Sequence, residues 1–318
     1  MYKSSIFFVI ILTLLSCTKE IEIDLPKPQT KISVFSTITP FTSPIPKYLN
    51  ISLLKSNYIF DSTHYYINDA TVYYSMNNII IDTLDYDIQN KTYTISSSIQ
   101  SYPIAGNKYG ITIVKSGFDT ISATTIVPQK VEITDTSITP IVYFDETGSV
   151  SSEIRISFND NANIKNYYEI VVSDISYNYN NINELYRLST NDKSVVVQSY
   201  YPSLDRFDLR MPRFLLFTDD FFNGTSHTMS IYYTPPQTES DHRYISSHYI
   251  SVHLRNVTKD YFMYKTTMLQ HLYQREENIL YGMGEPINVH SNIKNGYGIF
   301  AAYNTDIVSM HIDKTKLN

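Results

Sequence analysis

Short runs of alternating apolar and polar residues, separated by polar turns, dominate residues 31–128. Successive side chains of a β-strand point to opposite faces, so a period of two indicates strands with one buried face. Asn77-Asn78 lies between two such runs and predicts a tight hairpin. About seven short strands at this spacing, with no helical period, predict an immunoglobulin-like β-sandwich over 31–128. Apolar positions of these runs include Ile32, Val34, Leu49, Ile51, Leu53, Val72, Tyr74, Tyr93, Ile95, Tyr109, Ile111, Ile113, Ile121 and Ala123.

The rest of the chain, 129–318, predicts a second β-rich domain. Ile154, Ile156 and Phe158 alternate, and the stretch 214–217 is strongly apolar. Residues 297–303 and 307–312 are expected to form two last strands, after a turn at Asn295-Gly296.

One segment of this second domain, about 258–280, has a helical period instead. Tyr261, Tyr264, Met268 and Leu272 recur at spacings of three and four residues, and Thr258 can cap the first turn. We expect this apolar stripe to pack on the sheet, and a groove for a partner is the alternative. The predicted fold is therefore mainly β, with one α-helix near the C-terminus.

The N-terminus predicts a lipid anchor. After Lys3, an apolar run of about ten residues is too short to span a bilayer and fits a signal peptide. It ends in Leu14-Leu15-Ser16-Cys17, which matches a bacterial lipobox. We expect residues 1–16 to be removed, Cys17 to carry lipid (palmitate among its acyl chains), and 17–30 to form an extended tether. The alternative is an ordinary signal peptide followed by an incidental cysteine.

The charge balance bears on the class of partner. The formal net charge is −6, and removal of Lys3 with the signal peptide leaves 24 basic against 31 acidic residues, or −7. Nucleic-acid binding requires a basic face, so this balance argues against it.

Tyrosine is abundant, with 29 residues, whereas tryptophan is absent. Codon usage in a genome of low GC content is one explanation, and a tyrosine-rich binding surface is the other, because Tyr adds contact area at low entropic cost. Several tyrosines near a long predicted loop are candidate contacts for a glycan or peptide. These are Tyr177, Tyr179, Tyr186, Tyr200 and Tyr201.

Recognisable catalytic machinery is absent from the sequence. There is no Gly-x-Ser-x-Gly, no His-Glu-x-x-His and no glycine-rich phosphate loop, and the only cysteine is assigned to the lipid. His248 and His253 would point to opposite faces of a strand and could not share a metal. We therefore predict a protein that is not an enzyme and has no cofactor or metal, with a hydrolase carrying an unrecognised site as the least favoured alternative.

Two acidic stretches have alternative interpretations. Asp160, Asn161 and Asn163 could offer oxygen ligands to Ca²⁺, but the stretch lacks the glycine and distal glutamate of an EF-hand loop, so a solvated loop is favoured. Asp219 and Asp220 could serve acid–base chemistry, but adjacent acidic residues in a turn more often accept hydrogen bonds from its backbone N–H groups.

Several motifs together resemble a family of Bacteroidota lipoproteins, domain of unknown function 4249. The start of the family's mature proteins is similar to the residues after Cys17, Thr-Lys-Glu-Ile-Glu-Ile-Asp-Leu-Pro. The end of the family's first sandwich is similar to Ile121-Ser-Ala-Thr-Thr-Ile-Val-Pro128. The start of one strand in the family resembles Asn166-Tyr167-Tyr168. One of its turns resembles Phe217-Thr-Asp-Asp-Phe-Phe-Asn-Gly224. The most specific stretch runs from Glu285 to Phe300, and Tyr297 and Ala301-Ala302 depart from its pattern.

This resemblance implies a location and a partner. Members are outer-membrane lipoproteins that often accompany TonB-dependent transporters, and the acidic tether resembles a surface-export signal. The expected function is therefore a non-enzymatic, surface-exposed accessory of a TonB-dependent nutrient transporter. An adhesion or envelope-structural module that binds surface glycan or protein is the alternative. The resemblance carries over no catalytic residue.

Overall fold

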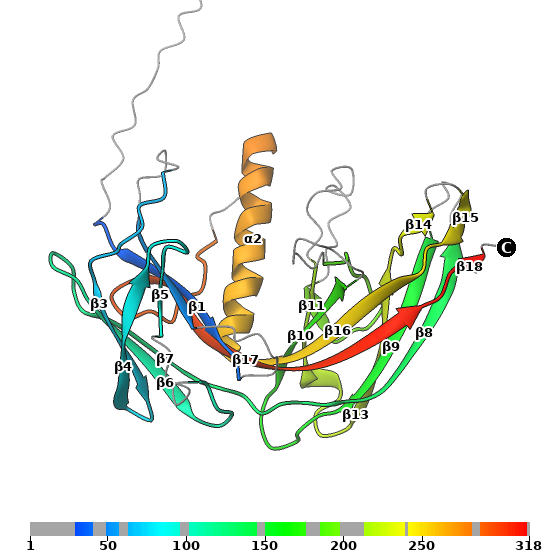
Figure 1. The fold of residues 1–318 in the computed structure, drawn as a ribbon, viewed down its shortest axis with the longest axis horizontal. Helices are drawn as coiled ribbons and strands as arrows, with labels where there is room; N and C mark the ends of the chain where they lie inside the picture. Colours follow the sequence, from blue (N-terminus) through cyan, green and yellow to red (C-terminus); the bar gives the residue numbers. More distant parts are fainter. Residues whose placement is uncertain are drawn as a thin grey trace, which may run out of the picture.

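The structure is a computed structural model that describes residues 29–40, 49–56, 63–95, 102–144, 150–175, 185–197, 213–238, 241–281 and 287–316. Cys17, the signal peptide and most of the tether lie outside these ranges. Within them, eighteen strands form three sheets of twelve, three and three strands, and α2 (Lys259–Tyr281) stands upright on the largest sheet (Figure 1). The prediction of a mainly β fold with one helix near the C-terminus is confirmed.

The first unit contains seven strands, as predicted. They are β1 (Ile32–Ile38), β2 (Asn50–Lys55), β3 (Thr71–Met76), β4 (Ile79–Asp87), β5 (Thr92–Thr94), β6 (Lys108–Val114) and β7 (Ile121–Ile126). Their order, β1-β2-β5-β4 followed by β3-β6-β7, reproduces the ABED and CFG sheets of an immunoglobulin constant domain. Alternate residues of each strand fill one core, in which Tyr74 and Tyr109 stack at 5.6 Å between ring centroids.

The predicted hairpin at Asn77-Asn78 joins β3 to β4. Both asparagines have positive φ, 51° and 68°, the backbone combination of a type I′ turn that asparagine tolerates better than most residues. The two strands that it joins pair antiparallel, from Met76 opposite Ile79 to Val72 opposite Leu84, and this pair links the two halves of the sandwich within one sheet.

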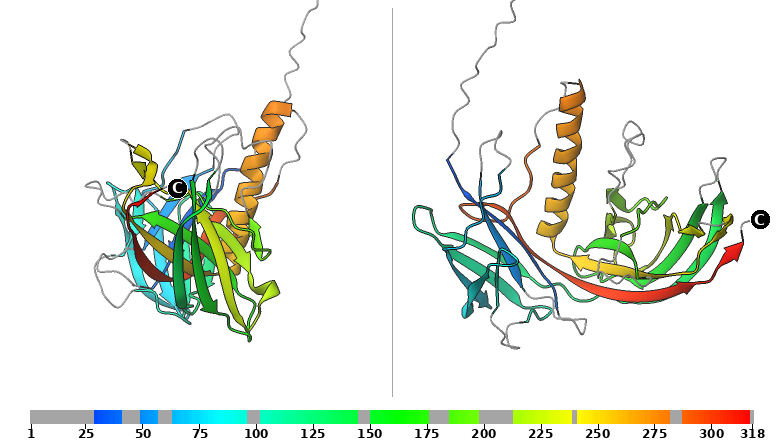
Figure 2. Two further views of the ribbon diagram at one scale, coloured as in Figure 1. Left: turned by 90° about the vertical axis from the view of Figure 1, so that its right-hand side faces the viewer. Right: turned by 45° about the horizontal axis from the view of Figure 1, so that its top comes forward.

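The second unit is a sandwich around its own core. One layer is β13-β9-β8, and the facing layer belongs to the twelve-stranded sheet, in the order β11-β12-β10-β16-β17. A small third sheet, β14-β15-β18, lies at the far end (Figure 2). The bounds are β8 (Ile133–Phe144), β9 (Val150–Asn159), β10 (Tyr167–Asp174), β11 (Val195–Val197), β12 (Leu215–Thr218), β13 (Ser226–Tyr233), β14 (Gln237–Thr238), β15 (Asp241–Ile245), β16 (His248–Val257), β17 (Tyr297–Ile312) and β18 (Thr315–Lys316).

Strand β17 joins the two units and corrects one prediction. The residues expected to form two strands, 297–303 and 307–312, form a single strand of 16 residues. Its first six residues pair in parallel with β1, and its last ten pair antiparallel with β16. The polar residues 304–306 resemble a turn in sequence, but Asn304 and Thr305 are buried and continue the pairing with β16.

The C-terminal part of the chain also completes the first core. Ile293, Phe300 and Ala302 pack among the buried residues of β1–β7. The division of the chain at residue 128 stays a prediction.

Helix α2 begins and ends within one residue of its predicted bounds. Its first turn is held by Thr258, whose Oγ1 accepts a hydrogen bond from the Tyr261 backbone N–H at 3.4 Å. Tyr261 and Phe262 are buried against Leu216, Val257, Ile299 and Ala301, so the first turns of the stripe pack on the sheet. Within the described residues, no helix combines the length and the apolar character needed to span a membrane.

We predict that Gly298→Ala disrupts the parallel pairing of β1 and β17. Gly298 has φ +96°, and an added Cβ would lie 2.1 Å from the Val34 carbonyl oxygen. Backbone strain and a clash with backbone together should cost more than about 3 kcal/mol of unfolding free energy. Urea denaturation of the purified mature protein measures this cost.

The matched control is Gly117→Ala. Gly117 also has positive φ, +83°, but nothing lies within 4 Å of its added Cβ. Gly117→Ala should lower the unfolding free energy by only about 1 kcal/mol, the cost of the backbone conformation alone. Equal losses in the two variants would contradict a role for the close approach to Val34.

Candidate functional site: a cleft beside helix α2

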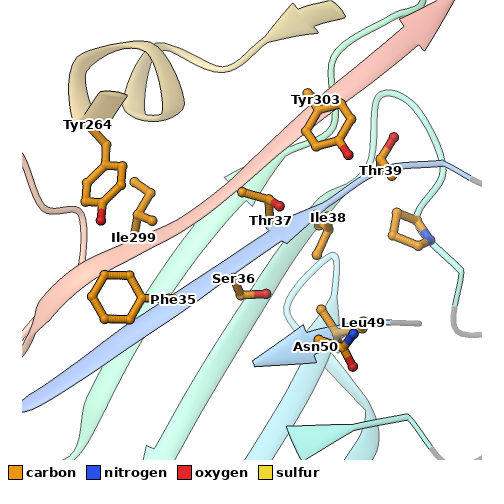
Figure 3. A pocket seen from close by; sticks show the side chains of 11 residues that line it. Phe35, Ser36, Thr37, Ile38, Thr39, Leu49, Asn50, Tyr264, Ile299 and Tyr303 are labelled. Carbon is orange, nitrogen blue, oxygen red and sulfur yellow. The ribbon is translucent and has the colours of Figure 1, made fainter. Parts of the chain in front are cut away.

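A cleft opens where β1 and β2 separate. The paired residues of these strands end at Phe35 and Ser52, after which β1 continues beside β17 and the other end of β2 pairs with β5. The second half of β1 therefore lacks the β2 partner that its first half has. This divergence, with α2 standing beside it, creates the space shown in Figure 3.

The cleft has a volume of about 750 Å³ and a mixed apolar and hydroxyl lining. Phe35 from β1 and Tyr264 from α2 meet edge to face across it, with ring centroids 6.5 Å apart. No Asp, Glu, His, Lys, Arg or Cys contributes to it among the described residues. The lining is formed by Phe35, Ser36, Thr37, Ile38, Thr39, Leu49, Asn50, Pro103, Tyr264, Ile299 and Tyr303.

Two lining hydroxyls are buried without a hydrogen-bond partner. Ser36 Oγ and Thr39 Oγ1 have none within the described part of the chain. A buried polar group without a partner costs about 1–3 kcal/mol, so native structures rarely leave one unused. Both atoms are buried, and Ser36 lies on the core-facing side of β1 between Val34 and Ile38. The polar side chains that the lining exposes are Thr37 and Asn50, while Phe35 and Tyr264 offer ring surface.

The wall of the cleft that belongs to α2 is fastened to the sheet by a buried carboxylate. Glu169 on β10 has no exposed surface. It accepts hydrogen bonds from Arg255 Nη1 on β16 at 2.6 Å and from the Tyr261 hydroxyl on α2 at 2.8 Å. Lys265, one turn further along α2, forms an ion pair with its second oxygen. One side chain thus connects two strands and two turns of the helix.

The cations of this cluster also contact aromatic faces. The Arg255 guanidinium lies 4.8 Å from the Tyr303 ring centroid, and Lys265 Nζ lies 4.0 Å from that of Phe214. Tyr303 is itself part of the cleft lining. The cluster therefore fixes both α2 and one aromatic residue of the cleft.

The electrostatics of the cluster keep Glu169 ionised. Burial alone would raise the pKa of the Glu169 carboxyl, but Lys265 and Arg255 together outweigh burial and lower it. Burial lowers the pKa of Lys265 despite the attraction of Glu169. In the cleft, burial raises the pKa of the Tyr264 phenol, which stays neutral at physiological pH.

Of the tyrosines predicted as ligand contacts, Tyr186 alone lies within the described residues; Tyr177, Tyr179, Tyr200 and Tyr201 do not. The Tyr186 hydroxyl donates to Asp174 Oδ2 at 2.8 Å, and its ring packs edge to face on Tyr233. Tyr186 is thus partly buried against the second core, away from the cleft. Its role in binding stays a prediction.

The acidic stretches serve local structure. Asp219 is fully buried and accepts a hydrogen bond from the Asn166 backbone N–H at 2.7 Å, and Asp220 accepts one from the Thr218 hydroxyl at 2.7 Å. Asp160 accepts from the Tyr168 hydroxyl at 2.5 Å and from the Gly224 N–H at 2.8 Å. Among the described residues, no group of three or more His, Cys, Asp or Glu is placed to hold a metal.

Sequence reasoning missed both the cleft and the Glu169 cluster. One available signal was Glu169 itself, a carboxylate in the apolar first part of the strand Tyr167–Asp174, because a charge buried in such a strand requires a partner. The cleft had no comparable signal, since it depends on where β1 and β2 separate.

Comparisons with known proteins identify a family. Residues 18–307 match the model of a family described as domain of unknown function (DUF4249), which confirms the resemblance based on motifs. No curated protein matches the chain. A crystal structure described provisionally as a membrane-anchored protein of Corynebacterium diphtheriae matches with 12% identity and a TM-score of 0.20. The match covers 87% of this chain and 60% of that one, and at this TM-score it supports no conclusion about fold or function.

We predict that Glu169→Gln destabilises the protein strongly. Removing the carboxylate charge leaves Arg255 and Lys265, whose side chains are only 19% and 27% exposed, without their counter-charge. The loss should cost about 3 kcal/mol of unfolding free energy, the lower end of the range for a buried pair. Because folding lowers the pKa of Glu169, its stabilisation is full above the ordinary glutamate pKa of 4.5 and is lost as the pH falls through the lower, folded value. Urea denaturation at pH 7 and down to pH 3 should show this loss in the native protein and a flatter profile in Glu169→Gln.

Asp69→Asn is the control, because Asp69 pairs with Lys115 at 2.8 Å but is largely exposed. Asp69→Asn should lower the unfolding free energy by at most about 1 kcal/mol. If Glu169→Gln lowered the unfolding free energy no more than Asp69→Asn does, the Glu169 cluster would not be the contact that fixes α2 on the sheet.

Proposed function

We propose, from the premise that the chain belongs to the DUF4249 family, that this protein is a non-enzymatic outer-membrane lipoprotein. In this proposal it is anchored through Cys17, exposed at the cell surface, and acts as an accessory of a TonB-dependent nutrient transporter. Its role is to bind and to hold a partner or ligand close to the membrane.

The observation that carries a binding function is the composition of the cleft. General acid–base or nucleophilic catalysis needs a titratable or activated side chain within reach of the substrate. The lining has no carboxylate, imidazole, amine or thiol, and its one kind of titratable group, the tyrosine phenol, is held neutral at Tyr264. Aromatic rings together with a few exposed, uncharged polar side chains, here Thr37 and Asn50, are typical of a site that recognises a neutral ligand.

The ligand class follows from the same groups. Thr37 and Asn50 are exposed and offer a hydroxyl and an amide to polar groups of a ligand. Phe35 and Tyr264 offer edges and faces to an apolar or ring-shaped group. A short neutral peptide segment or a glycan fits this description. A strongly charged ligand would find no counter-ion among the lining residues.

A lipid anchor would make a weak site of this kind effective. Confinement to the membrane converts binding to a neighbouring membrane protein into a nearly intramolecular event, with effective concentrations in the millimolar range for short tethers. The transporter as the partner rests on the family resemblance, which is an analogy.

The partner is tested by affinity purification of the full-length lipidated protein from its own outer membrane in mild detergent, with mass spectrometry. We expect a TonB-dependent barrel in a stoichiometric amount. Recovery of the lipoprotein alone would contradict the transporter partnership, and binding of the protein to whole cells or surface polysaccharide would then favour adhesion.

We further predict that Thr37→Arg weakens partner recovery at least tenfold. Thr37 is exposed and lines the cleft, so arginine would fill the space with a long cation without disturbing the core. Thr83→Arg, on exposed β4 outside the cleft, is the matched control and should recover the partner fully. Both variants should keep the native unfolding free energy within about 0.5 kcal/mol. Equal recovery with the two variants would exclude the cleft as the binding site.

A further inference from the structure

The first described residues of the chain lie at one end of the first sandwich. The Ser56 backbone N–H donates to the Lys31 carbonyl at 2.8 Å, and the Lys31 N–H donates to Ser56 Oγ at 2.9 Å. The tether therefore leaves from the end at which β1 begins and β2 finishes. The hairpin between β3 and β4 lies at the other end, toward the bottom of Figure 1, whereas β1 begins at the upper left.

Large apolar and aromatic side chains are exposed at the end where the tether leaves. Ile88, in the turn between β4 and β5, is 81% exposed, and Tyr65 and Tyr297 are each 48% exposed. Tyr66 forms a bridge to Leu54 of β2, which places Tyr65 and Tyr66 beside the same strand ends. We call Lys31, Tyr65, Tyr66, Ile88, Lys91 and Tyr297 the tether-end surface.

Lysines of this surface lie over its tyrosine rings. Lys31 Nζ is 5.2 Å from the Tyr297 ring centroid, and Lys91 Nζ is 5.1 Å from that of Tyr66. Tyrosine concentrates at the boundary between headgroups and acyl chains, and lysine places its apolar stem there while its charge stays in the headgroup layer. Tyrosine, lysine and one projecting isoleucine are together the chemistry of an interfacial contact.

Among the described residues at this end, lysines outnumber aspartates. The described residues there include five lysines, Lys31, Lys55, Lys91, Lys115 and Lys294, against three aspartates, Asp69, Asp87 and Asp119, which gives a local charge of +2. The full chain carries −6. Basic residues near anionic headgroups are attracted by about 1 kcal/mol each, so this end is the one that a membrane would favour.

The tether limits the distance from the lipid. Residues 17–28 are twelve residues, which reach at most about 40 Å when fully extended. We propose that the tether-end surface rests on the headgroups of the bilayer that holds the Cys17 lipid, an inference that depends on the lipid anchor of the proposed function. The cleft is lined by the second half of β1, Phe35 to Thr39, so it lies farther from that bilayer than the start of the strand does.

The test uses the full-length lipidated protein in vesicles of phosphatidylcholine and phosphatidylglycerol. Cys17 is the only cysteine, and lipid attachment would consume its thiol, so a single new cysteine can be spin-labelled selectively. Ile88→Cys places the label on the tether-end surface. Ile80→Cys is the control, because Ile80 is 61% exposed at the opposite end of the sandwich.

We expect the label at residue 88 to collide readily with oxygen, which concentrates in lipid, and to be protected several-fold from a water-soluble nickel chelate. The label at residue 80 should be fully accessible to nickel. Lys31→Glu combined with Lys91→Glu should remove the protection at residue 88, whereas Lys108→Glu, at the opposite end, should not.

Three results would overturn the inference. Full nickel accessibility at residue 88 in a protein whose Cys17 carries lipid, verified by mass spectrometry, would overturn the orientation but leave the proposed function standing. Absence of lipid on Cys17 would overturn both. Protection of residue 88 in native outer membranes but not in pure lipid vesicles would assign this surface to a protein partner instead.

Discussion

The parallel pairing of β1 with the start of β17 is the contact on which the whole arrangement depends. It joins residues 33–38 to residues 297–302 and makes one twelve-stranded sheet out of strands from both units. Such close backbone approach is possible because residue 298 has no side chain, with the Val34 carbonyl where a Cβ would lie. The same strand then supplies Phe300 and Ala302 to the first core and Ile299 and Ala301 to the packing under α2.

The position of helix α2 on the sheet links the Glu169 cluster to the cleft. Helix α2 stands on the sheet where β10, β16 and β17 pass beneath it, and Glu169 holds it there through Arg255, Tyr261 and Lys265. A buried ion pair of this kind adds little net stability compared with apolar packing, but it defines one position of the helix, since any shift would leave charges unpaired. That position sets the distance between Tyr264 and Phe35, and with it the width of the cleft.

Local patterns in the sequence predicted the elements well, and the contacts between distant elements poorly. Alternation identified the seven strands of the first sandwich, Asn77-Asn78 identified its hairpin, and the helical stripe identified α2 within one residue at each end. The same patterns could not show that β17 is continuous, because Asn304, Thr305 and Asp306 resemble a loop until their burial and pairing are known. Alternation records which face of a strand is buried and carries no information about its partner. Alternation therefore could not predict that β1 pairs with β17, or that Glu169 pairs with a lysine 96 residues away.

The long reach of β17 also has a consequence for how the protein is made. Contacts between residues far apart in sequence form late, because the intervening chain must first be closed into a loop. The first sandwich contains the earliest strands of the chain, yet its core stays open on one side until residues 293–302 have been delivered. During synthesis from the N-terminus, the core of the first sandwich therefore gains Ile293, Phe300 and Ala302 only after most of the chain has been made. The pairing of β17 with β1 that unites the two units forms at the same late stage.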